Sequence, residues 1–169
     1  MPMKTSTKLM KVLLTNILIA ISISIVASYL GISSAGLPAE AFVPALVSTT
    51  GINIVLSYII SFFVGWFIPA EGWGFAFARV CGLSPRDGLK FGMVLNVVVN
   101  TVYVVINALT LTYVNAIVTQ GMPMAMFPMA LFGSSFQCWL VGYVVSLLWA
   151  PTCEAIARKK CDDPAPQMP

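Results

Sequence analysis

The polar groups best placed to form a site in this chain are amide side chains within an otherwise apolar stretch. Asn96, Asn100 and Asn107 stand at i, i+4 and i+11, with Tyr103 at i+7. In an α-helix these intervals place the four side chains along one face. Amide and phenol groups both donate and accept hydrogen bonds while uncharged at neutral pH. The chemistry that this row offers is therefore the binding of other polar groups.

A row of amides in an apolar helix has two interpretations. An amide in hydrocarbon must find a hydrogen-bond partner, so the row is expected to join helices, with Asn16 and Asn53 as its partners and each bond contributing about 0.6 and at most about 1.7 kcal/mol. The alternative is a polar groove or small-molecule site, because the row follows much of a membrane's depth and exceeds what packing requires. Including amides from two other apolar stretches, the candidate polar site comprises Asn96, Asn100, Tyr103, Asn107, Asn16 and Asn53.

Groups that catalyse reactions or carry ions are missing from the apolar stretches. The chain has no His, and no Asp, Glu, Lys or Arg falls within the body of those stretches. Ionisable groups are the usual carriers of proton relays and ion sites in membranes, and a Ser or Thr nucleophile needs an activating base. We therefore expect no enzymatic activity, no catalytic residue and no cofactor. The four cysteines match no zinc-binding spacing, so no metal site is expected.

The apolar stretches themselves predict the fold. A chain of 169 residues that is 59% hydrophobic and 9% charged lies outside the range of soluble domains. A membrane-spanning helix needs about 20 mostly apolar residues, and the stretches 12–32, 42–68, 89–114 and 124–149 qualify. The sequence predicts an all-α polytopic membrane protein with four transmembrane helices. The first stretch has the basic start of a signal peptide but a longer apolar core, and we expect it to remain as a span.

The distribution of basic residues predicts the orientation. All nine Lys and Arg residues lie before the first span, between the second and third spans, or after the fourth span. Basic residues of short loops stay on the cytoplasmic side, so both termini are expected in the cytoplasm and the chain in the cytoplasmic membrane. Each cluster holds three charges beside a span, which suits lipid headgroups. No nucleic-acid partner is expected.

An internal repeat relates the two halves of the chain. With a shift of 80 residues Asn16 aligns with Asn96, and with a shift of 85 residues Ser61 aligns with Ser146. A two-span unit returns the chain to its starting side, so two copies insert in the same orientation. We expect two parallel two-helix repeats, residues 1–83 and 84–160, followed by a disordered cytoplasmic tail, residues 161–169.

Small residues recur at every fourth position along the second and fourth spans. They let helices approach closely in lipid, where the hydrophobic effect gives no drive for association. The predicted helix-packing residues are Ser57, Ser61, Gly65, Gly142 and Ser146.

The loop 69–88 joins the two halves. Its aromatic residues beside Arg79 suit the headgroup zone, so we expect an interfacial segment. Ser84, Pro85 and Asp87 then predict a helix start. Glu71 in this loop is expected to be a solvated charge that contributes little to stability.

Three features of the half-unit form a pattern. They are an early Asn in the first span, a Phe near the start of the second and a Pro-to-Arg exit, carried by Asn16, Asn96, Phe42, Phe127, Pro151 and Arg158. In these features the half-unit resembles the domain of unknown function 2798 family, a group of short two-span bacterial membrane proteins. The resemblance implies a tandem pair of such units covering nearly the whole chain, and it implies no activity.

Two functions are compatible with these features. The first is a non-enzymatic accessory protein or self-associating bundle, whose partners are the lipid bilayer and a second copy of the chain, as a dimer, or another membrane protein. Four helices enclose little of a pathway without a second copy, and small-residue seams suit a dimer. The alternative is a facilitator or exporter of a small uncharged or cationic solute along the polar face of the third span. The surroundings of the third-span asparagines distinguish the two.

Overall fold

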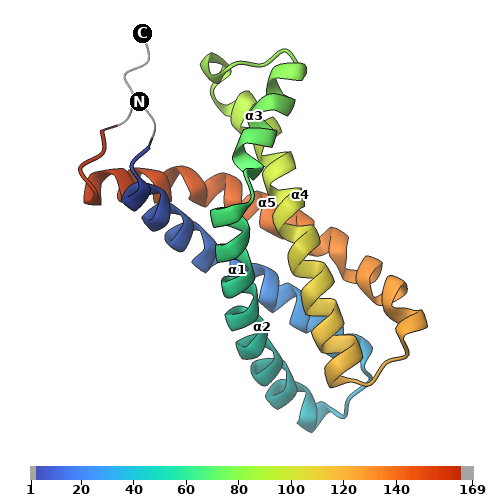
Figure 1. Ribbon diagram of the computed structural model, residues 1–169. Coiled ribbons are helices and arrows are strands. Elements are labelled where there is room, and N and C mark those ends of the chain that lie inside the picture. The colour runs from blue at the N-terminus through green and yellow to red at the C-terminus, as the bar shows by residue number, and fades with distance from the viewer. Residues whose placement is uncertain (1–2, 165–169) are drawn as a thin grey trace.

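Four long helices form the body of the protein (Figure 1). The computed structural model describes residues 3–164, and this range contains helices and no strand. The long helices are α1 (Thr5–Ser34), α2 (Ala39–Phe67), α4 (Leu89–Thr112) and α5 (Phe127–Lys160). Each is long and apolar enough to cross a membrane. The prediction of an all-α protein with four helices that can span a membrane is confirmed.

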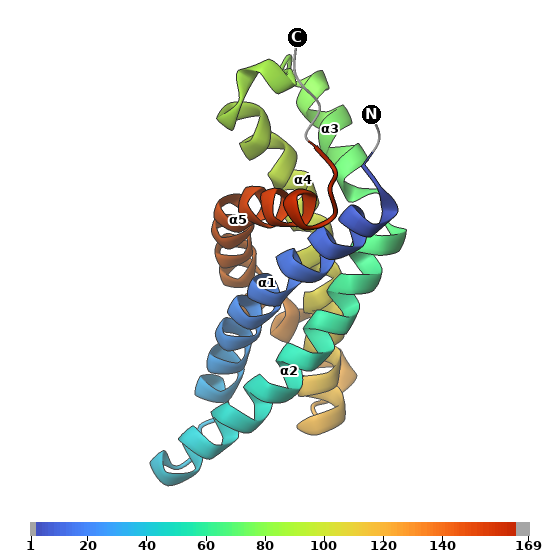
Figure 2. The ribbon, with the colours of Figure 1, turned by 90° about the vertical axis from the view of Figure 1, so that its left-hand side faces the viewer.

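The helices extend beyond the predicted spans where the sequence is polar and basic. α1 begins at Thr5 rather than at residue 12, and α5 continues to Lys160 rather than ending at residue 149. An apolar stretch marks only the part of a helix that suits lipid, whereas backbone hydrogen bonds continue into polar turns. Pro151 lies inside α5, and the last turns of α5 run across the bundle rather than along it (Figure 2), as expected for a proline kink.

The loop between the second and third spans forms a helix of its own, α3 (Ala70–Val80). α3 follows α2 and packs against the first part of α4 (Figure 1). A methyl group on Gly74 would lie 2.7 Å from the backbone oxygen of Leu95, so a glycine is needed for this close approach. Ser84 and Asp87 then cap a short 3₁₀ turn, Pro85–Asp87, that leads into α4. The segment expected at the interface is thus a helix packed on α4.

The long helices close a ring in the order α1, α2, α4, α5. α1 packs extensively on both α2 and α5, and α4 packs on α5, whereas the contact between α2 and α4 is smaller. Trp149 of α5 reaches α1 directly, because its Nε1 donates to the backbone oxygen of Leu14 at 3.3 Å. The predicted halves therefore contact each other mainly through α1 on α5 and through α3 on α4. Their origin as two parallel repeats stays a prediction.

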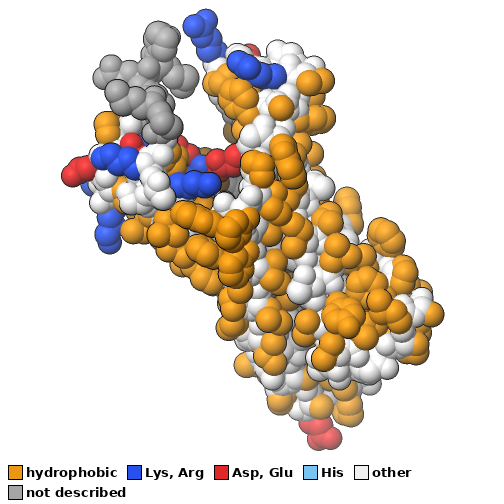
Figure 3. Space-filling model, in the orientation of Figure 1, with side chains coloured by type: hydrophobic (Ala, Val, Ile, Leu, Met, Phe, Trp, Pro, Cys, Tyr) orange, Lys and Arg blue, Asp and Glu red, His pale blue; other side chains and the backbone are white. Residues whose placement is uncertain are grey.

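Charged and apolar side chains occupy different parts of the surface. Apolar side chains cover the visible face of the bundle, and most charged side chains gather at the end near both termini (Figure 3). We call this end, where α1 and α4 begin and α2 and α5 end, the basic end. The apolar surface suits contact with a lipid bilayer, and the chain is a multi-pass membrane protein.

The first residues of the predicted disordered tail are ordered. Asp163 is 8% exposed, and its Oδ2 accepts a hydrogen bond from the backbone nitrogen of Lys4 at 2.9 Å. The prediction of disorder is therefore wrong for the turn at 161–163, because a carboxylate can satisfy a backbone N–H near the start of α1. Residues 165–169 lie outside the described residues.

Candidate functional site

A cavity of about 350 Å³ lies at the basic end of the bundle. α1 and α5 supply one wall, while α2, α3 and α4 supply the other. Asn96, Asn100 and Tyr103 line it from α4, and Asn16 lines it from α1. Their spacing of three or four residues along α4 directs these side chains to one face. Four of the six predicted polar residues thus surround one space, which we call the basic-end cavity.

Asn96 uses its amide to hold α5. Its Nδ2 donates to Ser146 Oγ at 2.9 Å and to the backbone oxygen of Tyr143 at 3.1 Å. The Ser146 hydroxyl lies 3.1 Å from Asn96 Oδ1 and can donate to it in return. Ser146, predicted as a packing residue, is the partner that makes this junction. The geometry assigns Asn96 a structural part, although its side chain also reaches the cavity wall.

Asn100 packs its amide against α5, and the residue also lines the cavity. Its Nδ2 donates to the backbone oxygen of Trp139 at 2.9 Å, and its Oδ1 receives no hydrogen bond from the residues that the structure describes. A methyl group on Gly142 would lie 2.8 Å from that oxygen. The glycine therefore admits the Asn100 side chain against α5 and leaves its oxygen as an acceptor.

Asn16 differs from Asn96, its counterpart in the predicted repeat. Asn16 is 1% exposed and lines the basic-end cavity. Its Nδ2 has no hydrogen-bond partner among residues 3–164. A buried amide without a partner costs about 1 to 3 kcal/mol. Asn16 is thus one place in the cavity wall where a polar ligand or water would relieve an existing cost, and Thr15, whose Oγ1 is also buried without a partner among the described residues, is another.

Tyr103 closes the cavity between α4 and α2. A methyl group on Gly65 would collide with the Tyr103 hydroxyl and lie 3.0 Å from Cγ1 of Val12. Gly65, another predicted packing residue, is therefore small enough to let the phenol of α4 lie against α2. Its hydroxyl can both donate and accept a hydrogen bond at the cavity wall.

The remaining two predicted residues lie outside the basic-end cavity and join helices. Asn107 Nδ2 donates to Ser61 Oγ at 3.0 Å, which connects α4 to α2. Asn53 Nδ2 donates to Ser28 Oγ at 2.9 Å, and its Oδ1 accepts from Asn115 Nδ2 at 3.0 Å. These contacts have the form of the interhelical bonds expected of amides in lipid, but the expected partners are wrong, because the amides of the row bond serines and backbone oxygens instead of Asn16 and Asn53. The amide row thus divides into a cavity part and a joining part.

A second cavity, of about 490 Å³, lies at the opposite end of the same bundle. α1, α4 and α5 line it together with η2 (Tyr113–Thr119), a π-helical segment that follows α4. Asn115 and Gln120 bring amides to its wall. Rare π-helical segments are found at functional sites more often than elsewhere. The sequence did not indicate this cavity, because a π segment has no pattern of its own in an apolar stretch.

A thin apolar layer separates the two cavities. It consists of a cluster of buried side chains, Ile19, Ile23, Val104 and Cys138. On α4 the boundary falls between adjacent residues, since Tyr103 lines one cavity and Val104 the other. On α1 it falls between Ile19 and Ile23, which is one helical turn or about 6 Å. Gly142 of α5 lies beside the same layer, against Ile23 and Val104.

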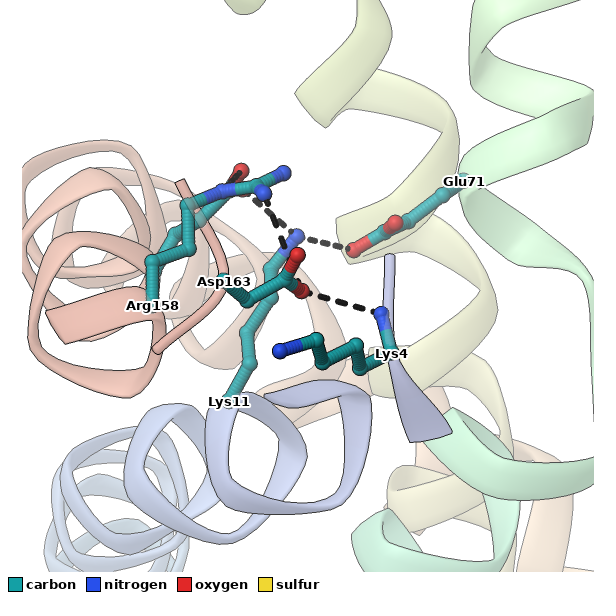
Figure 4. Close-up of polar contacts among 6 residues, drawn as sticks. Lys4, Lys11, Glu71, Arg158 and Asp163 are labelled. Carbon is teal, nitrogen blue, oxygen red and sulfur yellow. Dashed lines mark hydrogen bonds and ion pairs between the residues drawn. The ribbon is translucent and has the colours of Figure 1, made fainter. Parts of the chain in front are cut away.

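An ion-pair network lies at the mouth of the basic-end cavity (Figure 4). Lys11 Nζ of α1 lies 2.8 Å from Glu71 Oε1 of α3 and 3.0 Å from Glu154 Oε2 of α5. Arg158 Nε pairs with Glu154 Oε1 at 2.9 Å. Glu71, predicted to be a solvated charge, thus bridges the cavity mouth, although its own side chain is largely exposed.

Comparison of this chain with known protein families, with curated proteins and with solved structures finds no match. The resemblance of each half to a two-span family therefore stays a prediction. What the structure defines is a class, a four-helix membrane protein with two cavities and a dividing apolar layer. Among residues 3–164, no group of three or more His, Cys, Asp or Glu side chains could hold a metal ion.

Proposed function

We propose that this protein facilitates the passage of a small polar solute through the bundle, the second of the two functions compatible with its sequence. The observation that carries this proposal is the pair of cavities at opposite ends of one set of helices. α1, α4 and α5 line both cavities, and a layer about one helical turn thick on α1 separates them. A bundle that served only to join helices would not need space at both ends.

The composition of the layer supports a gate rather than a permanent seal. Its members are four apolar side chains without charge or hydrogen bonding to the cavities. Apolar constrictions between wetter spaces can gate by losing and regaining water. Polar groups flank the layer on each side, with Asn100 toward the basic end and Asn115 toward the other. A solute would therefore leave one polar wall and meet the next after a short apolar step.

A flux experiment with barrier variants tests this function. Proteoliposomes are mixed rapidly with glycerol or urea, and solute entry is followed by light scattering. We expect faster entry than in protein-free vesicles, faster entry still with Val104→Ala, and slower entry with Asn100→Leu. Val105→Ala is the matched control, because Val105 is 49% exposed on the outside of the bundle. Equal rates in all these vesicles, including protein-free ones, would refute facilitation.

The first of the two functions, a self-associating or accessory bundle, does not depend on the passage of a solute and is tested separately. The exposed apolar side chains of α2 and α5 suit lipid and a neighbouring helix alike. Native mass spectrometry in mild detergent tests it, because a strictly monomeric protein without partners would count against it.

A further inference from the structure

We propose that the basic-end cavity is a binding site for an uncharged solute that carries both a hydrogen-bond acceptor and a donor, such as a small amide. The solute's oxygen would accept from Asn16 Nδ2, and its N–H or O–H would donate to Asn100 Oδ1. This assignment rests on the proposed function, since it names the class of solute that would cross.

The first observation is the unequal treatment of two asparagines at the same repeat position. Asn96 has its amide engaged by Ser146 and Tyr143 of α5 at 2.9 to 3.1 Å. Asn16 has a buried Nδ2 without a partner among the described residues, although it is equally part of the cavity wall. A donor left buried and unpaired in the wall of a cavity favours ligands that bring an acceptor, because binding can then satisfy a group that folding left unsatisfied.

The second observation is the complementary acceptor on the facing helix. Asn100 lines the cavity from α4, and its Oδ1, which lies beside Gly142 of α5, is left without a donor because its Nδ2 is bonded to Trp139 O. A ligand that only accepts would leave this oxygen unmatched, and one that only donates would leave Asn16 unmatched. A primary amide carries a carbonyl acceptor and N–H donors together. A volume of about 350 Å³ falls within the range of small-molecule sites.

The third observation is the charge of the cavity. Lys11, a charged group at the mouth, has a largely buried side chain, and Glu71 and Glu154 both pair with it. The Lys8 ammonium lies over the ring of Trp66, 5.4 Å from its centroid. Below this mouth the polar lining consists of amide and hydroxyl groups. A charged solute would lose its hydration there without an opposite charge in return, which favours an uncharged one.

A protection experiment tests the assignment with three probes of similar size. The four native cysteines are replaced by Ala, and Val99→Cys, on the cavity wall, is labelled with an uncharged thiol reagent. Acetamide is expected to slow the labelling, whereas acetate and methylammonium are expected to leave it unchanged. Asn16→Ala is expected to raise the acetamide concentration for half protection about threefold to tenfold, the value of one hydrogen bond.

Two controls keep the result interpretable. Ile17→Ala changes a neighbouring, lipid-facing side chain of α1 and is expected to keep full protection. Asn16→Ser keeps a donor in a smaller side chain. Its acetamide concentration for half protection is expected to lie between those of the wild type and Asn16→Ala. Protection by acetate or methylammonium in place of acetamide overturns the assignment and leaves facilitation standing on its flux data. Protection by acetamide without any solute flux supports the binding site and removes facilitation.

Discussion

Lys11 and Glu71 join the two walls of the basic-end cavity through one ion pair of 2.8 Å, although they are 60 residues apart in the chain. Lys11 belongs to α1 and Glu71 to α3. The Lys11 side chain is 14% exposed and that of Glu71 is 69% exposed, so the pair is anchored on one side and reached by solvent on the other. Its position suits control of access to the cavity more than support of the fold.

Glu71→Gln is expected to open the mouth without unfolding the protein. The lost pair contributes at most about 1 kcal/mol, because Glu71 is mostly exposed, and Lys11 keeps Glu154. The labelling rate of Val99→Cys in the same cavity should rise, while the melting temperature changes little. Glu40→Gln, at the start of α2, is the control that should alter neither quantity. A labelling rate unchanged by Glu71→Gln would show that the pair does not limit access.

Gly142→Ala is expected to reduce both solute flux and stability. A methyl group there would lie 2.8 Å from Asn100 Oδ1 and 3.2 Å from Ile23 Cδ1, so both side chains must move. Overpacking of this kind typically costs about 1 to 3 kcal/mol. Gly51→Ala on α2 is the matched control, because it also replaces a helical glycine, its new methyl group meets nothing within 4 Å, and the residue lines neither cavity. Unaltered flux with Gly142→Ala would place the route elsewhere.

Asn107→Ala is expected to weaken the contact between α2 and α4 and to leave solute selectivity unchanged. The substitution removes the bond to Ser61, and an interhelical bond of this type contributes about 0.6 and at most about 1.7 kcal/mol. Thermal unfolding in detergent measures the loss, and flux ratios for glycerol and urea measure selectivity. A changed flux ratio with unchanged stability would contradict the structural part assigned to Asn107.

Asp163 is expected to make stability depend on pH in the acidic range. The hydrogen bond from the Lys4 backbone holds the pKa of Asp163 below 3.8, so its contribution is present above that value and is lost as pH falls through the lowered pKa. Wild type should exceed Asp163→Asn in melting temperature at about pH 6, and the gap should close below about pH 3.8. Asp162→Asn is the control, since only the backbone oxygen of Asp162 bonds Lys4. If wild type still had the higher melting temperature in acid, the stabilising part assigned to the charged Asp163 carboxylate would be contradicted.

Residue type and spacing predict the four spans and which amides share a helical face, but they do not predict what each amide contacts. Asn96 and Asn100 share a helical face by their separation of four residues, and both reach the cavity wall. Periodicity says which residues share a face but not what faces them. Whether an amide meets a serine, as Asn107 meets Ser61, or a space, as Asn16 does, depends on how two helices cross.

Other features required the packed structure. The bridge between Lys11 and Glu71 depends on where α3 follows α2, which no local pattern in the loop determines. The partnership of Asn115 with Asn53 depends on the π-helical segment, which shifts the register after α4. The apolar layer looks like ordinary core in the sequence, because Ile and Val are common throughout the spans. The layer can be interpreted as a barrier only because the structure places a cavity on either side of it.

The most direct test of two cavities divided by one apolar layer is the sidedness of cysteine labelling in oriented vesicles. In a chain without native cysteines, Asn100→Cys lies on the basic-end cavity and Ser134→Cys on the opposite-end cavity. We expect a membrane-impermeant thiol reagent to label Asn100→Cys only from the side of the basic loops and Ser134→Cys only from the other side. Labelling of both from the same side, or of neither while exposed Cys81 reacts in a Cys81-only control, would contradict the account.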